Sequence, residues 1–402
     1  MSNNKLRLKH LVSVHNGYGF PVEFQGDKGT IPFYKVSDMN TIGNEKYLVN
    51  SNNYVTEELC KSKNWKLVPA GSIILPKIGA ALLTNKRRMT SQPCLIDNNC
   101  CALIPVDMNQ GEWIYNSVLN IDSGDFCQSG AVPALKMGDF LLSEISLPND
   151  RENLLITLES KLSLVDSSIG NLTQKLHHLE EYKTALIHNA VTKGLDANGV
   201  ALVNNDDWKN VQFKEVILKI KEGGTPSTKV DEFWENGDIP WITAPDIDNG
   251  NIKVNKKITK KGYLSSSTHL WNKGDILFSS KGTVGKSALV NFSLVTNQNI
   301  MGMSLDKSKT DPKFVLYVLK LNSKEIQDKA KSTTMGAIYL EDILLQKINF
   351  PGLIDQITIS KYIDDKEKIL DKSKSIINKK IALLLEYKKS LINEAVSGKQ
   401  KE

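Results

Sequence analysis

Two long stretches of the chain repeat hydrophobic residues at the spacing of a helix. In residues 151–192, apolar side chains recur at steps of three and four, and Pro and Gly are almost absent. Residues 355–396 repeat this pattern. A run sustained over several heptads is typical of a helix that packs along a second long helix. We therefore predict two long helices. The same spacing of three and four residues places Tyr182 and Tyr387 on their packing faces. The predicted packing residues are Leu158, Leu162, Val165, Leu172, Leu176, Leu179, Ile363, Leu370, Ile377, Ile381, Leu384 and Leu391.

The rest of the chain consists of short apolar runs broken by Gly, Pro and Asn. Runs such as Ser72–Pro76 and Asp275–Ser279 have the length of strands and are bounded by turn-forming residues. The predicted fold class is mixed α/β (α+β), with two globular domains that are each followed by a long helix. The predicted segments are a first globular domain at 1–146, its helix at 147–194, a linker at 195–207, a second globular domain at 208–350, and a second helix with its tail at 351–402.

Four sequence blocks occur twice, in the same order. Glu181-Tyr182-Lys183 recurs as Glu386-Tyr387-Lys388. The other pairs are Gly29–Phe33 with Gly237–Trp241, Gly71–Leu75 with Gly274–Phe278, and Ser129–Val132 with Met335–Ile338. Their slightly drifting offsets indicate one ancestral half of about 200 residues that was used twice. Because the long helices are repeats of each other, we expect them to pair. The alternative is that each helix packs only on its own domain.

Composition and charge narrow the class of protein. The 402 residues are 40% hydrophobic, which is enough to build folded cores. No window is apolar enough for a spanning helix and no apolar signal core follows the first residues, so we expect a cytoplasmic protein. The five cysteines include no CxxC pair, which fits a reducing compartment. The net charge of +6 permits an anionic partner, and basic residues cluster at Lys86-Arg87-Arg88 and Lys256-Lys257.

One glycine-rich loop invites comparison with a phosphate-binding loop. Residues 282–287 end in Gly-Lys-Ser, yet Ser280 occupies the position of that motif's first glycine. Residues 288–292 then have the pattern of a strand rather than of a helix whose N-terminus would hold phosphate. A nucleotide-dependent enzyme that uses this loop stays open as an alternative, and so does a coiled-coil scaffold with no nucleic-acid role. The sequence contains no catalytic or metal-binding constellation, which favours a binding protein.

Several motifs of the second half stand out together, and Asn16–Phe20 stands near the start of the first half. The second-half motifs are Trp208-Lys209, Gly223–Ser227, Gly237–Ile242, Gly274–Phe278, Lys281–Lys286 and Glu386–Lys388. In this combination the chain resembles the DNA specificity (S) subunit of type I restriction-modification systems, although its first half lacks the Gly-Gly-Thr-Pro and Gly-Thr-Val-Gly-Lys stretches. The resemblance implies that each globular domain is a target-recognition domain for one half of an asymmetric bipartite DNA sequence. It also implies an antiparallel coiled coil with pseudo-two-fold symmetry, which sets the spacing of the half-sites.

The resemblance further implies partners and DNA-contacting residues. The expected partners are double-stranded DNA, two modification (methyltransferase) subunits and, in a full complex, restriction or translocase subunits. No catalytic residue, metal or cofactor is expected on this chain; S-adenosylmethionine would bind the modification subunits, and ATP with Mg²⁺ the full complex. Basic and polar loop residues would contact phosphates and base edges. The predicted DNA contacts are Tyr18, Lys77, Lys86, Arg87, Arg88, Thr225, Ser227, Lys281, Thr283, Lys286 and Thr334.

Overall fold

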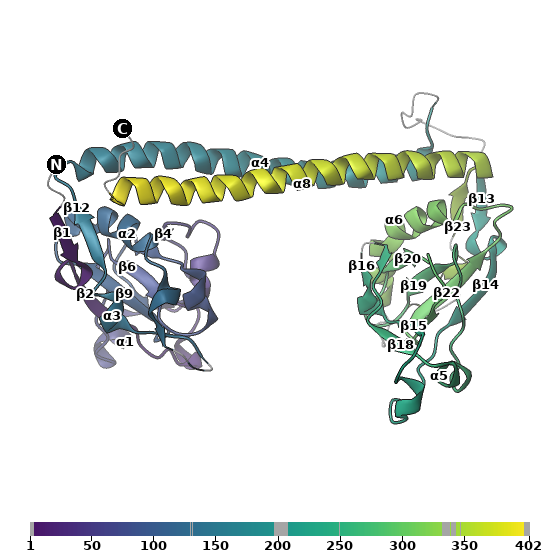
Figure 1. Cartoon of the computed structure of the whole chain (residues 1–402), viewed down its shortest axis with the longest axis horizontal. Coiled ribbons are helices and arrows are strands. Elements are labelled where there is room, and N and C mark those ends of the chain that lie inside the picture. Colours follow the sequence, from purple (N-terminus) through teal and green to yellow (C-terminus); the bar gives the residue numbers. More distant parts are fainter. Residues whose placement is uncertain are drawn as a thin grey trace. The chain divides into compact units, whose positions relative to one another are not determined.

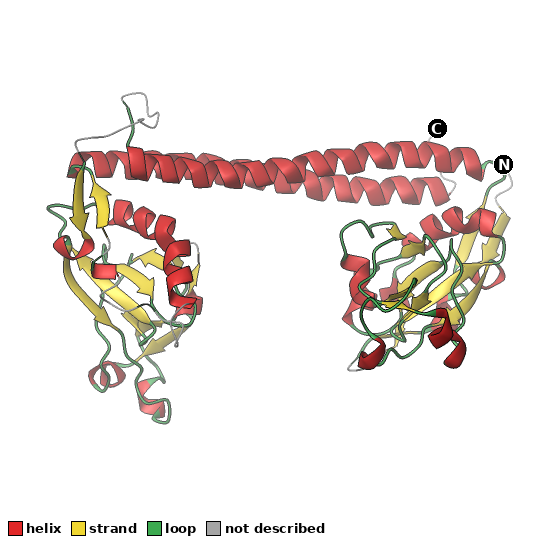
Figure 2. Ribbon diagram, turned by 180° about the vertical axis from the view of Figure 1, so that it is seen from behind, coloured by secondary structure: helices red, strands yellow, loops and turns green. Residues whose placement is uncertain are grey.

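The computed structural model describes most of the chain, and Figures 1 and 2 show its elements. The described residues are 4–128, 130, 132–196, 208–248, 250–331, 338, 343–345 and 347–397. The chain divides into two compact units, Met1–Thr173 with Asn378–Glu402, and Gln174–Ile377. Each unit contains one globular domain and a part of both long helices, so the division crosses the predicted helix segments.

The first domain has a five-stranded sheet in the order β2-β9-β6-β7-β4 and a three-stranded sheet in the order β5-β3-β8. The larger sheet comprises β2 Val12–Asn16, β9 Cys100–Pro105, β6 Ile73–Pro76, β7 Arg88–Thr90 and β4 Tyr47–Leu48, and the smaller comprises β5 Tyr54–Val55, β3 Ile31–Tyr34 and β8 Leu95–Ile96. The further strand pairs are β1 Asn4–Arg7 with β12 Glu144–Leu147, and β10 Cys127–Gln128 with β11 Ala134–Leu135. The helices are α1 Glu57–Ser62, α2 Gly111–Leu119 and α3 Met137–Phe140. Because β6 is an unbroken apolar run, it is buried along its whole length, and it shares a core with Trp113 and Phe140.

The second domain has a four-stranded sheet in the order β14-β22-β19-β20 and a three-stranded sheet in the order β18-β15-β21. These strands are β14 Ile217–Glu222, β22 Ile300–Leu305, β19 Ile276–Ser279, β20 Ser287–Leu289, β18 Lys256–Ile258, β15 Ile239–Ile242 and β21 Val295–Thr296. The further pairs are β13 Lys209–Gln212 with β23 Lys347–Phe350, and β16 Ile247–Asp248 with β17 Asn251–Ile252. The helices are α5 Lys260–Leu264 and α6 Pro312–Lys331. Phe278 of β19 and Phe314 of α6 lie in its largest core.

The strands of the two domains pair in the same register. Ile73 of β6 faces Leu103 of β9, just as Ile276 of β19 faces Met303 of β22. In the smaller sheets, β3 lies between antiparallel β5 and parallel β8, and β15 lies in the same way between β18 and β21. Two of the repeated pairs, Gly29–Phe33 with Gly237–Trp241 and Gly71–Leu75 with Gly274–Phe278, therefore contribute equivalent strands, as expected of a duplicated domain. The pair Ser129–Val132 and Met335–Ile338 lies partly outside the described residues.

The long helices run antiparallel within each unit. They are α4 Arg151–Lys193 and α8 Leu353–Ser397. In the first unit Lys388 Nζ lies 2.6 Å from Asp166 Oδ1, and in the second unit Lys183 Nζ lies 2.9 Å from Glu367 Oε1. An early residue of α4 thus meets a late residue of α8, and a late residue of α4 meets an early residue of α8. The fold is a mixed α/β fold with two domains and coiled-coil helices.

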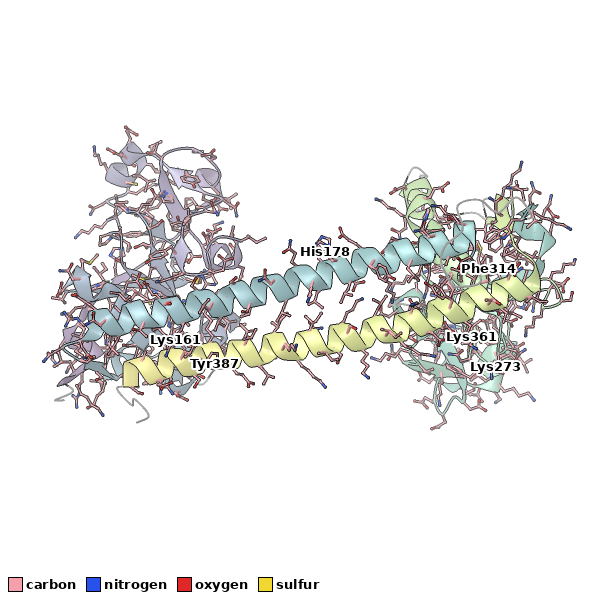
Figure 3. All side chains as sticks on the ribbon, turned by 90° about the horizontal axis from the view of Figure 1, so that it is seen from above. Lys161, His178, Lys273, Phe314, Lys361 and Tyr387 are labelled. Carbon is pink, nitrogen blue, oxygen red and sulfur yellow. The ribbon has the colours of Figure 1, made fainter. Side chains whose placement is uncertain are left out.

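The predicted packing residues are all at least partly buried. Leu158, Val165, Ile363, Leu370 and Leu391 are buried, and Leu162, Leu172, Leu176, Leu179, Ile377, Ile381 and Leu384 are partly buried. Tyr182 and Tyr387 differ, because 53% and 52% of their surfaces are exposed; Figure 3 labels Tyr387 on α8. Each tyrosine follows two successive steps of three residues. At about 100° per residue, those steps turn its side chain by roughly 120° away from the packing face.

In each unit, parts of both long helices also pack on the globular domain. Leu154 of α4 and Val396 of α8 contact the core of the first domain. Leu186 of α4 and Ile359 of α8 belong to the core of the second. The alternative in which each helix packs only on its own domain is therefore wrong, since each domain contacts both helices.

Candidate nucleic-acid interface

In each domain, three loops lie together where neighbouring strands of the main sheet end or begin. In the second domain, β14 and β19 end where β22 begins, because β22 is antiparallel to both. The loops that follow Glu222 and Ser279 and the turn that precedes Ile300 therefore lie together. Strands β2, β6 and β9 bring the corresponding loops together in the first domain. We call each set of three loops the loop edge of its domain.

A close approach of two backbone segments fixes the start of each loop edge. Gly17 N donates to Cys100 O at 3.3 Å, and Gly223 N donates to Ile300 O at 3.0 Å. A Cβ atom at Gly17 would lie 1.9 Å from the carbonyl oxygen of Asp97, and one at Gly223 would lie 2.1 Å from that of Thr296. These distances are far below van der Waals contact, so only glycine fits where the chain leaves the sheet.

At each loop edge, a lysine that follows the central strand β6 or β19 bonds to the last residue of a neighbouring strand. Lys77 follows β6, and its amine donates to Asn16 Oδ1 at 2.8 Å. Lys281 lies just after β19 and forms a 2.9 Å ion pair with Glu222. Asn16 and Glu222 are equivalent, since each is the last residue of its strand and faces position 101 or 301 of the neighbouring strand. The two domains thus place the same cation beside a neutral partner in one case and an anionic partner in the other.

The glycine-rich loop 280–286 is a hairpin that is closed by Ser279. Gly285 N donates to Ser279 O at 3.0 Å, and Lys286 N donates to Ser279 Oγ at 2.9 Å. The loop leads directly into strand β20, and Lys286 Nζ donates to Ala244 O at 3.3 Å. A phosphate-binding loop needs free amides and a following helix N-terminus, and here two amides are already bonded and a strand follows. The nucleotide-binding interpretation of this loop is therefore wrong, whereas Thr283 is exposed on it.

Polar side chains of the second loop edge face solvent. Thr225 and Ser227 are exposed, and Thr225 Oγ1 is hydrogen-bonded to Gln298 Oε1. Their backbone is held in place, because Trp241 Nε1 donates to Gly224 O at 3.0 Å and Trp234 Nε1 donates to Ser227 O at 3.1 Å. The sequence prediction missed Gln298. Its place in the turn just before the apolar strand β22 was the signal that could have identified it.

Tyr18 packs inside the first loop edge. Its hydroxyl accepts a hydrogen bond from Lys66 N at 2.9 Å, and its ring stacks on Trp65 at a centroid distance of 5.8 Å. The His15 ring meets it edge-on at 5.5 Å. Burial, with the nearby Lys66 charge, lowers the pKa of His15 below its ordinary value. Tyr18 therefore supports the loop edge through its ring contacts and through one hydrogen bond that its hydroxyl accepts.

The basic cluster Lys86-Arg87-Arg88, at the start of β7, is only partly available to a ligand. Arg87 is 0% exposed, and burial lowers its pKa to about 10. The prediction that Arg87 contacts DNA is therefore wrong, because its guanidinium has no surface to offer. Arg88 is half-buried and donates to Met39 O at 2.7 Å, while the Lys86 amine is bonded to Asn40 Oδ1. The remaining predicted contact, Thr334, lies outside the described residues.

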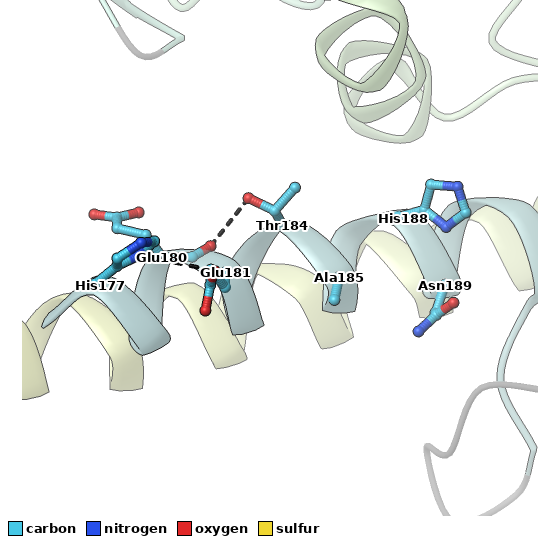
Figure 4. Close-up of a pocket in the computed structure, with 7 residues that line it drawn as sticks. All are labelled: His177, Glu180, Glu181, Thr184, Ala185, His188 and Asn189. Carbon is cyan, nitrogen blue, oxygen red and sulfur yellow. Dashed lines mark hydrogen bonds and ion pairs between the residues drawn. The ribbon is translucent and has the colours of Figure 1, made fainter. Parts of the chain in front are cut away.

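One further group of titratable side chains in the described part of the chain lies on α4. Figure 4 shows a pocket that is lined by one face of α4. Its lining residues are His177, Glu180, Glu181, Thr184, Ala185, His188 and Asn189. His178 lies 3.1 Å from Glu181 and lowers its pKa, and Thr184 donates to Glu180 O at 3.0 Å. Over the described ranges, no three His, Cys, Asp or Glu side chains group as metal ligands would. Within the same ranges, no helix has the length and apolarity needed to cross a membrane.

Comparisons with known sequences agree on one family. Residues 205–386 match the family described as type I restriction modification DNA specificity domain. The MjaIX specificity subunit of Methanocaldococcus jannaschii is 30% identical over 188 residues, which cover 44% of this chain and 43% of that protein. The EcoprrI specificity subunit of Escherichia coli is 33% identical over 105 residues, which cover 25% of this chain and 26% of that protein. The chain therefore spans less than half the length of these relatives.

Solved structures agree on the fold along nearly the whole chain. A chain from "Structural basis underlying complex assembly and conformational transition of the type I R-M system" has a TM-score of 0.73 at 15% identity, and the match covers 98% of this chain and 97% of that one. The HsdS subunit from Thermoanaerobacter tengcongensis has a TM-score of 0.53 at 15% identity, with 98% and 96% covered. At such low identity the likeness concerns the fold alone. The comparisons therefore show a type I restriction modification DNA specificity domain in residues 205–386, and a fold shared with these solved structures along nearly the whole chain.

Proposed function

We propose that this chain is the DNA-binding specificity subunit of a type I restriction-modification complex, in which each domain recognises one half of an asymmetric bipartite target. The observation that carries the proposal is the loop edge, which occurs once in each domain on the same strand register but with different side chains. A shared scaffold with diverged loops suits two recognition domains that bind different base sequences. The target-recognition domains are assigned to residues 1–146 and 208–350, joined through the linker 195–207.

The lysines of the loop edges are assigned to phosphates and the exposed polar side chains to bases. Phosphate contacts set the position of a protein on the duplex, whereas base-edge contacts in the grooves specify the sequence. The proposed phosphate contacts are Lys77, Lys86, Lys281 and Lys286. The proposed base contacts are Thr225, Ser227, Thr283 and Thr334, and we add Gln298 because its amide is the kind of group that pairs with base edges. Tyr18 and Arg88 remain proposed DNA contacts of the first domain, and their hydrogen bonds also support its loop edge.

The long helices are assigned to spacing and assembly. Their antiparallel ion pairs and buried leucines support a stiff coiled coil. Two modification subunits would dock on this chain, bind S-adenosylmethionine and methylate adenine, and restriction subunits would add ATP-driven translocation and cleavage. This chain carries no catalytic step in that scheme, and it would work in the cytoplasm, where the DNA and its partners are found.

Shortening both helices together tests the spacing assignment. Because Asp166 faces Lys388, residues 167–173 of α4 and 381–387 of α8 form matched heptads that can be removed together. The loss of one heptad shortens a helix by about 10 Å, or roughly three base pairs of duplex. The spacer between the half-sites should shorten while both half-site sequences stay the same. A change in the half-site sequences instead would contradict the assignment of spacing to the helices.

Selection from a pool of random duplex DNA tests the proposed function. The full chain, together with its modification subunits, is expected to enrich two short conserved sequences separated by a spacer of constant length. Binding should weaken steeply as salt rises, because phosphate contacts release counterions. Enrichment of no sequence, or of a single continuous one, would overturn the proposal. A coiled-coil scaffold with no nucleic-acid role predicts the first of these contrary results.

A further inference from the structure

Arg87 is a buried cation for which no anionic partner lies within ion-pair distance in the described part of the chain. It is 0% exposed, its guanidinium makes hydrogen bonds and a ring contact, and the charge of Asp122 acts on it from beyond ion-pair distance. Its Nε is buried without a hydrogen-bond partner in the described structure. Burial of an unpaired charge is costly unless hydrogen bonds replace its water. Its pKa of about 10 still leaves the side chain charged at neutral pH. The segments that its hydrogen bonds join therefore bear on what the side chain does.

Those hydrogen bonds join the end of one loop to a separate segment. Arg87 Nη2 donates to Ser123 Oγ at 2.5 Å and to Asn85 Oδ1 at 2.9 Å. Asn85 Oδ1 also accepts from Ser123 N at 3.0 Å, and Asn85 has a left-handed backbone with a φ of 54°. The guanidinium lies 5.8 Å from the centre of the Phe140 ring, which covers its face. The guanidinium, Asn85 and Ser123 therefore form one closed hydrogen-bonded cluster.

The loop that this cluster closes is the hairpin 77–87 of the first loop edge. At its start, Leu135 N donates to Lys77 O at 2.9 Å, and Gly79 N donates to Pro133 O at 2.8 Å. At its end, Arg87 fastens it to Ser123. Both ends of the hairpin are thus tied to the stretch between α2 and α3. Arg87 and Asn85 supply the ties on either side of Lys86, which is one of the proposed phosphate contacts.

The second domain lacks this arginine and closes its hairpin differently. Ile74 faces Arg88 and Leu277 faces Ala288, so the strand register places Ser287 where the first domain has Arg87. Ser287 Oγ is buried without a hydrogen-bond partner in the described structure. The shorter hairpin 280–286 needs no such tie because Ser279 already binds its backbone at both Gly285 and Lys286. A buried arginine is therefore particular to the longer hairpin of the first domain.

We infer that Arg87 is a positioning residue for recognition of the first half-site: it holds hairpin 77–87 in its DNA-recognising shape without touching DNA. This inference rests on the proposed function of the two domains. Because only the first domain depends on such an arginine, loss of Arg87 should weaken base recognition in the first half-site and leave recognition of the second half-site unchanged.

Base-by-base selection from the random duplex pool tests this inference. The parent should discriminate against wrong bases in each half-site by roughly tenfold or more. R87K keeps the charge but cannot reach Asn85 and Ser123 with one planar fork. It should lower discrimination in the first half-site to less than about threefold and leave the second half-site unchanged. S287A, at the equivalent position of the second domain, should change neither half-site.

The outcomes separate a positioning role from a merely structural one. Equal loss of binding for all sequences, with the base preferences of both half-sites intact, would mean that Arg87 only stabilises the fold and would overturn the inference. Unchanged preferences in a folded R87K chain would overturn it too. If R87K does not fold, S123A carries the test, because it keeps Arg87 and removes its shortest hydrogen bond. A parent chain that enriches no sequence overturns the proposed function, and the inference falls with it.

Discussion

Lys281 Nζ lies 2.9 Å from a carboxylate oxygen of Glu222 at the loop edge of the second domain. At the first loop edge, Lys77 takes the amide oxygen of Asn16 as its partner at 2.8 Å. The two lysines therefore offer different net charges to an approaching phosphate, although the strands that carry them are equivalent. Lys77 keeps a full positive charge, whereas that of Lys281 is offset by its neighbour.

Exchanging the two partners should change the salt dependence of DNA binding in opposite directions. E222Q removes the carboxylate that offsets the charge of Lys281 at its phosphate, and N16D gives Lys77 such a carboxylate. Each fully formed phosphate contact contributes about one to the slope of log affinity against log salt. E222Q should steepen this slope and N16D should flatten it, each by up to about one, as measured by fluorescence anisotropy on one duplex over a salt series. Equal slopes for both variants and the parent would show that neither lysine meets a phosphate.

Alanine at Gly17 should destabilise the first domain. The new Cβ would lie 1.9 Å from Asp97 O, and backbone cannot move aside as a flexible side chain can. Such overpacking costs about 1–3 kcal/mol or more, and it should lower the urea midpoint of unfolding. Gly19→Ala is the matched control, because nothing lies within 4 Å of a Cβ built there. Equal stability of the two variants would contradict the close approach at Gly17.

Truncation of Leu158 should destabilise the first unit through the helix pair. Leu158 is 3% exposed and packs in a cluster with Leu391 and Ile392 of α8. Removal of a buried leucine side chain costs about 2–5 kcal/mol, depending on how far the cavity collapses. Leu164→Ala on the same helix is the control, since Leu164 is 69% exposed. Thermal unfolding of both variants checks the difference, and similar melting temperatures would mean that α4 and α8 do not pack at Leu158.

His15 should make the first unit less stable in mild acid. Burial and the Lys66 charge lower its pKa below the ordinary 6.5 of the unfolded chain. As pH falls below about 6.5, the unfolded state takes up the proton first, so this contribution to the free energy of unfolding is lost with decreasing pH. The His15→Asn variant should show a flatter dependence of the urea midpoint on pH. His10→Asn, at an exposed histidine of the same domain, should follow the parent.

The long helices and the duplication could be predicted from sequence because both leave periodic signals. Steps of three and four residues marked buried positions such as Leu158 and Leu391, since these steps keep a side chain on one helix face. Tyr182 and Tyr387 escaped the same rule, because two consecutive steps of three rotate a side chain away from that face. Periodicity thus predicts the packing face of a helix well, except where two or more steps of three residues follow one another and turn a side chain away from it.

The loop edges could be predicted only in part because burial and pairing depend on distant residues. Arg87 stands in a basic run, and nothing local distinguishes it from Lys86; its burial comes from Ser123 and Phe140, which lie far along the chain. Gln298 was missed because its hydrogen bond to Thr225 joins two segments that only the antiparallel strand pairing brings together. The order of residues along the chain therefore predicts neither the burial of Arg87 nor the hydrogen bond of Gln298 to Thr225.

A map of methylated adenines, obtained by long-read sequencing of host DNA with and without this chain, tests the central claim most directly. The account predicts methylation within one asymmetric motif of two short half-sites at constant separation, and its complete loss when the chain is removed. Replacement of residues 208–350 by a different recognition domain should change one half-site and preserve the other. Methylation that persists unchanged without the chain, or a motif that does not divide into two independently exchangeable halves, would contradict the account.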